Sequence, residues 1–510
     1  MNRVSGSGWL QRLEGHRGDR EALVVEGRSI DYAVLTARSS ATAERLQALG
    51  VEAGDLVAVL AAPSAAGVAL IHAMFDRSFV MLPLNLRLTE REQREALART
   101  HARFLIVAEG GDSALARRLS EAVGCGLIEF LAPDAALQQD AEWVSLRAPS
   151  DALSNRFADD RARRCKERAA LVLQTSGTSG RPKAAVLSLE NLIASARASA
   201  ELLGSCEGDR WLLCLPLYHI GGLSILIRSA LLGTSVVLHE RFDAPRVASA
   251  LEEDRITQVS FVATMLAGVM EVRGDRPAPG SLALVLLGGG PASQELLSRA
   301  RRLEYPLAPT YGLTEAASQI ATRPPAAPVA DEGDLAAGLQ PMPGVEIRIV
   351  DAEGAPVETG CDGEIEVRGP IVMSGYLDDP RATANAIHDG WLATGDVGRL
   401  DPKGRLRVLD RRADLIVSGG ENVYPAEIES ILTTHPEIED AGVVGVPDEE
   451  FGARPLAFIV LRRGVSSAPT DLEAFCRARL ARYKIPVEFI EVSELPRTAS
   501  GKLLRRKLAR

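Results

Sequence analysis

Residues 173 to 183 read Leu173-Gln174-Thr175-Ser176-Gly177-Thr178-Ser179-Gly180-Arg181-Pro182-Lys183, directly after the apolar run 169–173. The segment places four hydroxyl groups, two glycines and one lysine within a few residues. Such a loop offers many hydrogen-bond donors, lets the backbone approach a ligand closely and carries a cation, as a polyphosphate site requires. Its spacing is not that of a Walker A loop, because Gly177 and Gly180 are three residues apart. Alone, the segment also fits an ordinary flexible turn.

The apolar runs and helix-capping signals before this loop predict an α/β fold. Residues 22–25 and 104–107 are short apolar runs typical of strands. Asp31 can cap a helix that runs to Gly50, which stands where a C-terminal glycine belongs. Residues 89–92, Thr-Glu-Arg-Glu, fit a capping box that opens another helix. Strands that alternate with helices indicate α/β layers with parallel sheet.

One uncharged stretch has the length of a membrane span. Residues 56–75 contain no Asp, Glu, Lys or Arg. However, they include Pro63, Ser64, Gly67 and His72, and many are alanines. A buried strand at 56–60, a turn and a buried helix therefore explain this stretch better than membrane insertion.

Chain length, net charge and cysteine content limit the class of protein. A chain of 510 residues is too long for a single core, so two or more domains are expected. The net charge of −10 argues against general nucleic-acid binding. The six cysteines show neither a CxxC pair nor a metal-ligand spacing, which favours reduced thiols and a cytoplasmic location.

The pattern changes twice after the first half of the chain. Residues 150–168 form a polar, arginine-rich connector, which we interpret as a solvated loop. Short strands and Gly/Pro/Asp turns between 333 and 409 predict an antiparallel or barrel-like section. A second change near 410–414 precedes about 100 residues with their own strand and helix signals, including Pro425 at a helix start. We therefore expect a separate small C-terminal domain.

Four further segments carry chemistry. Residues 311–315, Tyr-Gly-Leu-Thr-Glu, supply an aromatic ring for a purine, a hydroxyl for a phosphate and a carboxylate for Mg²⁺. Thr394-Gly395-Asp396 ends an apparent strand or turn and offers a carboxylate to ribose hydroxyls, although most Gly-Asp pairs are simple turns. Residues 410–429 are densely polar, and residues 496–502 end a flexible run on Lys502.

In this order, the five segments resemble those of the adenylate-forming superfamily, which includes acyl-CoA synthetases, peptide-synthetase adenylation domains and luciferases. The resemblance extends from about residue 10 to residue 510. It implies a large N-terminal domain of α/β layers with a small β-barrel-like section, residues 1–410, and a small mobile α+β domain, residues 411–510. It also implies an enzyme that joins a carboxylate to AMP and passes the acyl group to CoA, with ATP, Mg²⁺ and CoA as cofactor and co-substrates.

The resemblance also implies roles for individual residues. Glu315 would bind Mg²⁺, Lys502 would bridge the attacking carboxylate and the α-phosphate, and His219 would act at the carboxylate end of the acyl pocket. Gly419 and Gly420 would line the CoA tunnel, and Ala413 would lie at the hinge near 411–414. The ATP-binding set would comprise Thr175, Ser176, Gly177, Thr178, Ser179, Gly180, Lys183, Gly288, Gly289, Gly290, Pro291, Tyr311, Gly312, Thr314, Asp396 and Arg411.

Two residues depart from the family pattern. Ala184 stands where glycine commonly follows the loop lysine, and Ala413 stands where the hinge often has Asp or Lys. Movement of the small domain should survive the second change, but its control can differ.

The acyl pocket is less clearly specified. His219 and Arg228 interrupt the strongly apolar run 215–229. A lone histidine there is also compatible with a structural role. An arginine is costly to bury unless it is paired. A second carboxylate on the substrate would pair it, and so would a protein acid; both alternatives stay open.

Residues 215–238, 286–291 and 418–429 resemble most the 2-succinylbenzoate–CoA ligases of menaquinone synthesis. Their substrate carries two carboxylates, of which one would be activated and the other would meet Arg228. Another aryl- or fatty-acyl-CoA ligase is an alternative, and a stand-alone adenylation enzyme that loads a carrier protein is a second. The resemblance implies small-molecule partners, no nucleic acid, no integral membrane association and a possible homodimer.

Overall fold

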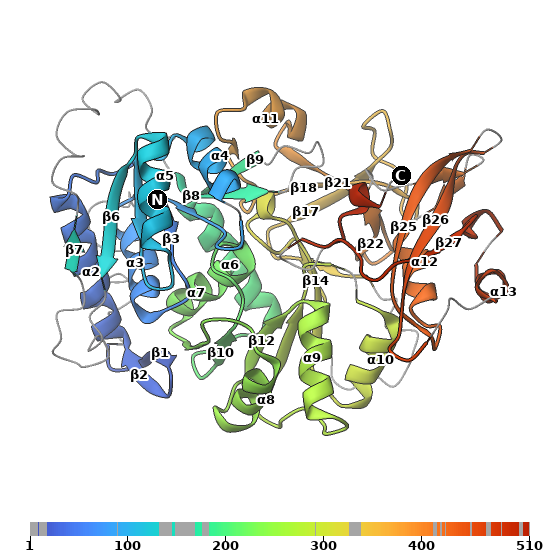
Figure 1. Cartoon of the computed structure of the whole chain (residues 1–510), viewed down its shortest axis with the longest axis horizontal. Coiled ribbons are helices and arrows are strands. Elements are labelled where there is room, and N and C mark those ends of the chain that lie inside the picture. The colour runs from blue at the N-terminus through green and yellow to red at the C-terminus, as the bar shows by residue number, and fades with distance from the viewer. Residues whose placement is uncertain are drawn as a thin grey trace.

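A computed structural model describes residues 9, 18–88, 90–131, 145–147, 169–175, 183–290, 292–325, 338–411, 416–418, 421–423, 425–448, 451–465, 471–480, 482–498 and 503–508. Two large sheets and their helices occupy the N-terminal part, and two smaller sheets follow toward the C-terminus (Figure 1).

The first large sheet is parallel at its centre. Its order is β16-β15-β14-β13-β12-β10-β11-β1-β2, and all pairs from β14 to β1 are parallel. The carboxyl ends of β13 and β14 therefore meet at one edge of the sheet. The strands are β1 Glu21–Val25, β2 Arg28–Asp31, β10 Arg210–Leu213, β11 Ser235–Leu238, β12 Gln258–Phe261, β13 Leu284–Leu287, β14 Leu307–Tyr311, β15 Ala321–Thr322 and β16 Gln340–Pro341.

The second large sheet has the order β19-β9-β8-β4-β3-β5-β6-β7. Its centre is parallel, whereas β8 and β9 form an antiparallel pair with β19 added at the edge. The strands are β3 Leu56–Leu60, β4 Val80–Pro83, β5 Phe104–Val107, β6 Gly126–Leu131, β7 Ser145–Arg147, β8 Ala169–Thr175, β9 Lys183–Ser188 and β19 Gly375–Tyr376.

Helices pack between and outside these sheets. Helices α2 (Tyr32–Ala48), α3 (Ala65–Asp76), α6 (Leu189–Leu203) and α7 (Ile220–Leu232) share one buried core with residues of both sheets. Helices α4 (Glu90–Thr100) and α5 (Ser113–Val123) cover the other face of the second sheet. Helices α8 (Ala244–Glu253), α9 (Ala263–Arg273) and α10 (Gln294–Arg302) cover the other face of the first. The predicted α/β layers are thus confirmed.

Local signals placed several of these elements correctly. Asp31 caps α2 by accepting a hydrogen bond from Val34 N, and the helix ends two residues before Gly50, whose φ is +88°. Helix α4 begins at Glu90, as predicted, while Thr89 of the proposed capping box lies outside the described residues. The uncharged stretch forms β3 and α3, as expected, and no helix among the described residues is long and apolar enough to cross a membrane. The whole connector 150–168 lies outside them too.

The section after 338 is antiparallel, as predicted. Strands β17 (Glu346–Val350), β18 (Gly363–Arg368), β21 (Trp391–Leu400), β20 (Ile387–His388) and β22 (Leu406–Arg411) form one five-stranded sheet, with α11 (Pro380–Ala386) beside it. All of its strand pairs are antiparallel. The segment 394–396 lies inside β21, so the expectation that it ends a strand is wrong. A register shift between β18 and β21 accommodates Gly395, whose φ is +72°.

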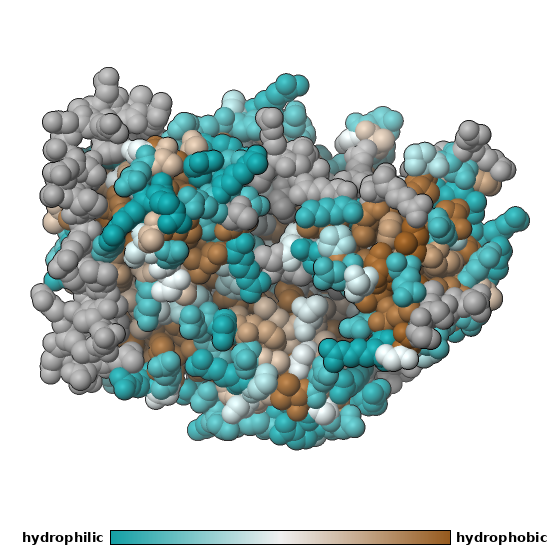
Figure 2. Space-filling model, in the orientation of Figure 1, coloured by the Kyte–Doolittle hydropathy of each residue, from teal (hydrophilic) through white to brown (hydrophobic). Residues whose placement is uncertain are grey.

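The C-terminal elements form their own sheet and core. Strands β23 (Ile416–Ser418), β24 (Glu421–Val423), β25 (Ile438–Asp448), β26 (Gly452–Leu461) and β27 (Phe489–Glu491) pack with α12 (Pro425–Leu432) and α13 (Leu472–Arg477). Apolar side chains gather over β25 and β26 in Figure 2. On one face of these strands Val444, Leu456 and Phe458 pack against Leu495 and Leu508, so the last described segment, 503–508, lies on this sheet.

Candidate active site

The hydroxyl-rich loop joins two antiparallel strands. β8 ends at Thr175 and β9 begins at Lys183, and these two residues are paired across the hairpin. Residues 176–182, which include Ser176 to Gly180, lie outside the described residues. Lys183 places its Nζ 4.7 Å from the centre of the Tyr376 ring. The Tyr376 hydroxyl in turn donates a hydrogen bond of 3.1 Å to Glu315 Oε1. The predicted loop cation and the predicted metal ligand thus flank one aromatic side chain.

Residues 311–315 turn sharply at the end of β14. Gly312 is necessary here, because an added Cβ would lie 1.5 Å from the carbonyl oxygen of Ser318. Thr314 and Glu315 follow in a short 3₁₀ turn, and the Glu315 carbonyl accepts a hydrogen bond of 2.8 Å from Met373 N. The tight turn therefore places the hydroxyl and the carboxylate just beyond the carboxyl end of β14.

Two residues predicted to contact the nucleoside meet directly. The Tyr311 hydroxyl donates a hydrogen bond of 2.7 Å to Oδ2 of Asp396, which is buried. Asp396 on β21 is also the register partner of Arg411 on β22. The Arg411 side chain is outside the described set, but its backbone pairs with that of Asp396. The structure thus brings the candidates for adenine and ribose, 85 residues apart in sequence, to one place.

The glycine run 288–290 follows β13, the neighbour of β14. An added Cβ on Gly288 would lie 2.7 Å from Thr310 Cγ2, and Gly289 has a φ of +81°. Both positions therefore favour glycine over residues that carry a side chain. Because β13 and β14 are parallel, this run and Tyr311 lie at the same edge of the sheet. Pro291, the last residue of this predicted set, is outside the described residues.

His219 precedes the first residue of α7. It is the N-cap residue, but its side chain makes no capping hydrogen bond. Burial and the nearby charge of Arg87 lower the pKa of His219, so the imidazole is neutral at pH 7. Its Nε2 is buried and has no hydrogen-bond partner among the described residues, and its ring lies 4.8 Å from that of Tyr218. A neutral imidazole with an unused nitrogen at a helix N-terminus suits an anionic or polar ligand.

Arg228 is one of the largest fully buried side chains described. Its Nη1 donates hydrogen bonds to the hydroxyl of Ser199 and to Gln319 Oε1, the latter at 3.2 Å. Its guanidinium carbon lies 4.0 Å from the centre of the Trp211 ring. Burial lowers the pKa of Arg228 to about 9, so the group remains a cation at neutral pH.

No described Asp or Glu forms an ion pair with Arg228, and its Nε and Nη2 have no hydrogen-bond partner among the described residues. Gln319 continues the contact toward the nucleotide candidates: its Nε2 donates to Thr322 Oγ1 at 2.8 Å and to Thr310 Oγ1 at 3.4 Å. Thr310 packs against Gly288. Arg228 is therefore a buried cation with two donors to spare, linked by side chains to the end of β13.

Several predicted residues lie outside the described set: Ala413, Gly419, Gly420 and Lys502. The residues that flank Lys502 are described. Arg497 and Leu503, which flank the segment 498–502, form an isolated β-bridge. Arg505 forms an ion pair of 2.8 Å with Glu429 on α12, and its Nε donates to the carbonyl of Val443. The bridge joins the two flanks of the predicted lysine segment, and Arg505 ties its C-terminal flank to α12 and β25.

The described residues fit a magnesium ion that arrives with a nucleotide. They contain no cluster of three or more His, Cys, Asp and Glu side chains that could hold a metal ion alone. Glu315 supplies one carboxylate, and Mg²⁺ is usually held by one or two carboxylates together with substrate phosphates and water. Glu315 is therefore suited to complete the coordination of a phosphate-bound Mg²⁺.

Sequence reasoning missed the partners of these residues. Tyr376, Ser199, Gln319 and Trp211 lie in unremarkable local sequence. Each meets its functional neighbour through tertiary packing: Gln319 is 91 residues from Arg228, and Tyr376 is 61 residues from Glu315. Only Arg228 gave a signal in the sequence, because an arginine in an apolar run needs polar partners when it is buried.

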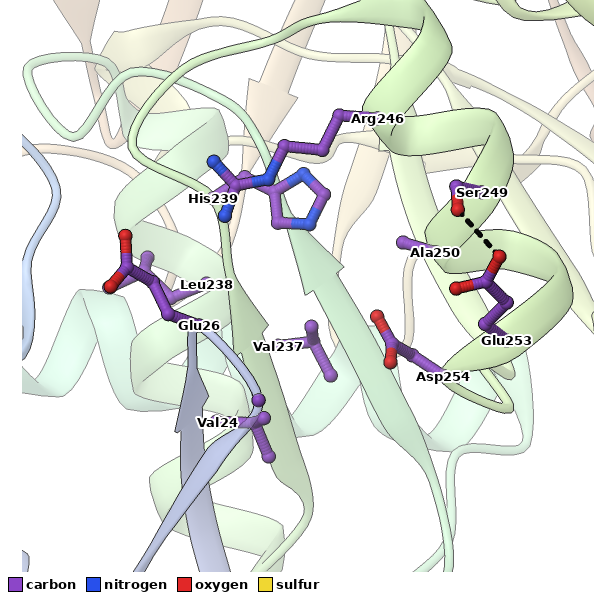
Figure 3. Close-up of a pocket in the computed structure, with 11 residues that line it drawn as sticks. Val24, Glu26, Val237, Leu238, His239, Arg246, Ser249, Ala250, Glu253 and Asp254 are labelled. Atoms are coloured by element: carbon purple, nitrogen blue, oxygen red, sulfur yellow. Dashed lines mark hydrogen bonds between the residues drawn. The ribbon is translucent and has the colours of Figure 1, made fainter.

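A separate cavity of about 290 Å³ lies beside β1, β11 and α8 (Figure 3). Its lining includes Glu26, His239, Arg246 and Asp254, and none of the predicted site residues lines it. We do not assign it to the candidate active site.

Comparison with known proteins is consistent with this arrangement. The AMP-binding enzyme family matches residues 10–377, and the AMP-binding enzyme C-terminal domain matches residues 427–502. The chain is 38% identical to the 2-succinylbenzoate–CoA ligase of Bacillus subtilis (98% of this chain, 97% of the relative) and 40% identical to that of Geobacillus kaustophilus (98% and 97%). It is similar to the solved structure of o-succinylbenzoate CoA synthetase from B. subtilis with its acyl-adenylate intermediate, with a TM-score of 0.84, 38% identity and 99% of each chain covered.

Proposed function

Because the chain belongs to the AMP-binding enzyme family, we propose that it is an ATP-dependent acid–CoA ligase that acts on 2-succinylbenzoate through an acyl-AMP intermediate. The observation that carries the choice of acid is Arg228, a buried cation with no described acidic partner. The names of the relatives at 38% and 40% identity support the same substrate.

In the first half-reaction, a carboxylate oxygen bonds to the α-phosphorus of ATP, and the bond from that phosphorus to the leaving diphosphate breaks. Two anions must approach each other, so positive charge has to be supplied. Lys183 and Lys502 would provide it from the protein, and Glu315 would hold the Mg²⁺ that accompanies the phosphates. Loss of one well-placed charge-stabilising donor typically costs about 3–4 kcal/mol in the transition state.

A second group of residues holds the nucleoside. Tyr311 and the glycines 288–290 form the adenine pocket, and Asp396 accepts hydrogen bonds from the ribose hydroxyls. The direct bond between Tyr311 and Asp396 supports this assignment, because it orients both side chains before the nucleotide arrives.

In the second half-reaction, the CoA sulfur bonds to the acyl carbon, AMP leaves and the thiol proton passes to solvent or to a basic group. We assign His219 to the carboxylate end of the acyl pocket, where its neutral imidazole with an unused Nε2 meets the reacting carboxyl group. We assign residues 411–414 as the hinge about which the domain 411–510 moves, so that Lys502 serves the first step and Gly419-Gly420 the second.

Arg228 then accounts for substrate selection. Its Nε and Nη2 would donate to the second carboxylate of the acid, while Ser199 and Gln319 hold Nη1. At this position of the substrate, a carboxylate is favoured far more than a methyl group or a halogen. Only the carboxylate offsets the charge of the buried guanidinium. A monocarboxylic aryl or fatty acid would leave that charge without a counterion.

One assay separates the candidate functions. Purified protein with ATP and Mg²⁺ is tested for CoA consumption with 2-succinylbenzoate, benzoate, 4-chlorobenzoate and octanoate. The proposal expects turnover mainly with 2-succinylbenzoate. Preference for octanoate or 4-chlorobenzoate would point to another acyl-CoA ligase. Acyl-AMP formation without consumption of free CoA would point to a carrier-loading enzyme.

We also propose a cytoplasmic location. The five described cysteines are free thiols, and three of them are buried, which suits a reducing compartment. Fractionation of the native cells tests the location, and sedimentation of the purified protein tests the predicted homodimer.

A further inference from the structure

The contacts of Tyr376 join the two charged groups of the phosphate site. Its ring faces the ammonium of Lys183 at 4.7 Å, and its hydroxyl donates to Glu315 Oε1 at 3.1 Å. We propose that Tyr376 is a positioning residue that sets the metal ligand Glu315 and the loop lysine Lys183 in their working geometry. This inference rests on the proposed use of ATP and Mg²⁺, and it assigns a role to a residue outside the sequence motifs.

A very short strand, β19, fixes the backbone of Tyr376. β19 is only two residues long and pairs with the outer edge of β9, with Gly375 opposite Val186 and Tyr376 opposite Ala185. Lys183 begins the same strand β9. Hydrogen bonds from Ser374 N to Val186 O and from Leu377 N to Ala184 O extend the pairing. The pairing therefore brings Tyr376 to the end of the hairpin from which Lys183 projects.

A second set of contacts fixes Tyr376 from its other side. Its backbone N donates a hydrogen bond of 2.9 Å to Thr383 Oγ1 in α11. Gly375 has a φ of +137°, and an added Cβ would lie 2.6 Å from Thr383 Cγ2. The chain thus uses a glycine to pass close to α11 and a threonine to hold the next residue. Tyr376 has little freedom to move away from the site.

Glu315 is tied to the same segment. Its carbonyl accepts a hydrogen bond of 2.8 Å from Met373 N, three residues before Tyr376. The backbones of Glu315 and Tyr376 are therefore linked, and the hydroxyl-to-carboxylate bond sets the rotation of the Glu315 side chain. A carboxylate that binds a metal usually needs such an outer partner, and loss of one typically lowers metal affinity or activity by about 10- to 100-fold.

The ring makes a separate contribution. A lysine at the end of a strand has several rotatable bonds, and an aromatic face near its ammonium favours a subset of its conformers. The ring of Tyr376 thus keeps the Lys183 ammonium near the carboxylate side of the site. Removal of the hydroxyl alone should affect the metal, whereas removal of the ring should also weaken nucleotide binding.

The test compares Tyr376→Phe, Tyr376→Leu and Thr383→Ala with Tyr305→Phe. Tyr305 is a matched control, because its hydroxyl also has a charged side-chain partner, Arg273, at 2.9 Å but lies away from the site. Binding of Mn²⁺ in the presence of a non-hydrolysable ATP analogue is followed by electron paramagnetic resonance. The Mg²⁺ dependence of acyl-AMP formation is measured in parallel.

We expect Tyr376→Phe to weaken Mn²⁺ binding by about 10- to 100-fold and to raise the Mg²⁺ requirement similarly. Thr383→Ala should weaken Mn²⁺ binding and raise the Mg²⁺ requirement by a smaller factor. This second variant still tests the inference if Tyr376→Phe folds poorly. Tyr376→Leu should in addition weaken binding of the ATP analogue, and Tyr305→Phe should match the wild type.

Unchanged or tighter Mn²⁺ binding by Tyr376→Phe would overturn the inference, since the hydroxyl would then be idle or would compete with the metal. The metal-binding readout needs no acid and no CoA. Failure of the wild type to use 2-succinylbenzoate would therefore refute the proposed substrate without deciding the role of Tyr376.

Discussion

The buried cation Arg228 offers the sharpest test of substrate selection. The change Arg228→Met removes the charge and both spare donors, Nε and Nη2, while its chain still fills most of the space beside Trp211. If those donors bind the second carboxylate of 2-succinylbenzoate, the variant must lose this interaction in both the ground state and the transition state.

The magnitude follows from the burial of Arg228. Truncating one partner of a buried, hydrogen-bonded charge pair costs about 2–5 kcal/mol. Since about 1.4 kcal/mol corresponds to a tenfold change, kcat/KM for 2-succinylbenzoate should fall by about 30-fold to about 5,000-fold. For benzoate or 4-chlorobenzoate, which lack a second carboxylate, kcat/KM should stay near its wild-type value.

Two opposing effects on stability should nearly cancel in this variant. The removal of a buried charge gains several kcal/mol of desolvation free energy. The Ser199 hydroxyl and Gln319 Oε1 lose their donor, at about 1–3 kcal/mol each. We therefore expect the free energy of unfolding to change by no more than about 2 kcal/mol, so the loss of activity is not a loss of fold.

The assay follows CoA consumption for each acid with wild type, Arg228→Met and the control Arg197→Met. Arg197 is on α6, the helix that carries Ser199, but its side chain is exposed, so the control should behave as wild type. Equal losses for 2-succinylbenzoate and benzoate in Arg228→Met would refute the reasoning, because they would make Arg228 a structural residue.

Three further changes probe the lysine segment, the turn after β14 and the buried histidine. Lys502→Ala should nearly abolish acyl-AMP formation and spare thioester formation from preformed acyl-AMP; separate assays of the two half-reactions check this, and equal losses would contradict it. Gly312→Ala should abolish ATP binding in titration calorimetry, because the new Cβ would lie 1.5 Å from the Ser318 carbonyl oxygen; near-normal affinity would contradict it. Burial lowers the pKa of His72 to about 3. Below about pH 6.5 the unfolded chain therefore binds a proton on His72 that the folded chain does not bind. The free energy of unfolding should then fall from about pH 6.5 toward pH 3, by up to about 1.4 kcal/mol per pH unit. In denaturant titrations His72→Leu should flatten this decline, and an unchanged pH profile would exclude His72 as its source.

Much of the fold was predictable because its signals are local. Asp31 lies next to the helix that it caps, and the uncharged run 56–75 contains both the strand β3 and the helix α3. The glycines 288–290 were named through the family resemblance alone, and Tyr311 through that resemblance and its own motif; the structure places them at the carboxyl ends of two neighbouring parallel strands.

The contacts that complete the site were not predictable in this way. Tyr376 reaches Lys183 and Glu315 because the two-residue strand β19 pairs with β9, across almost 200 residues of sequence, and no local pattern marks such a short strand. The sequence left open whether Arg228 pairs with a substrate carboxylate or with a protein acid. The structure surrounds it instead with a hydroxyl from α6, an aromatic ring from β10 and an amide from the segment just before β15.

In the proposed reaction, the acid is activated as its adenylate before it is transferred to CoA. The most direct measurement incubates the protein with 2-succinylbenzoate, ATP and Mg²⁺, first without and then with CoA, and identifies the products by mass spectrometry. We expect 2-succinylbenzoyl-AMP and diphosphate in the first stage, then 2-succinylbenzoyl-CoA and AMP in the second. Formation of ADP and phosphate, or no adenylate from this acid while another acid reacts, would contradict the account.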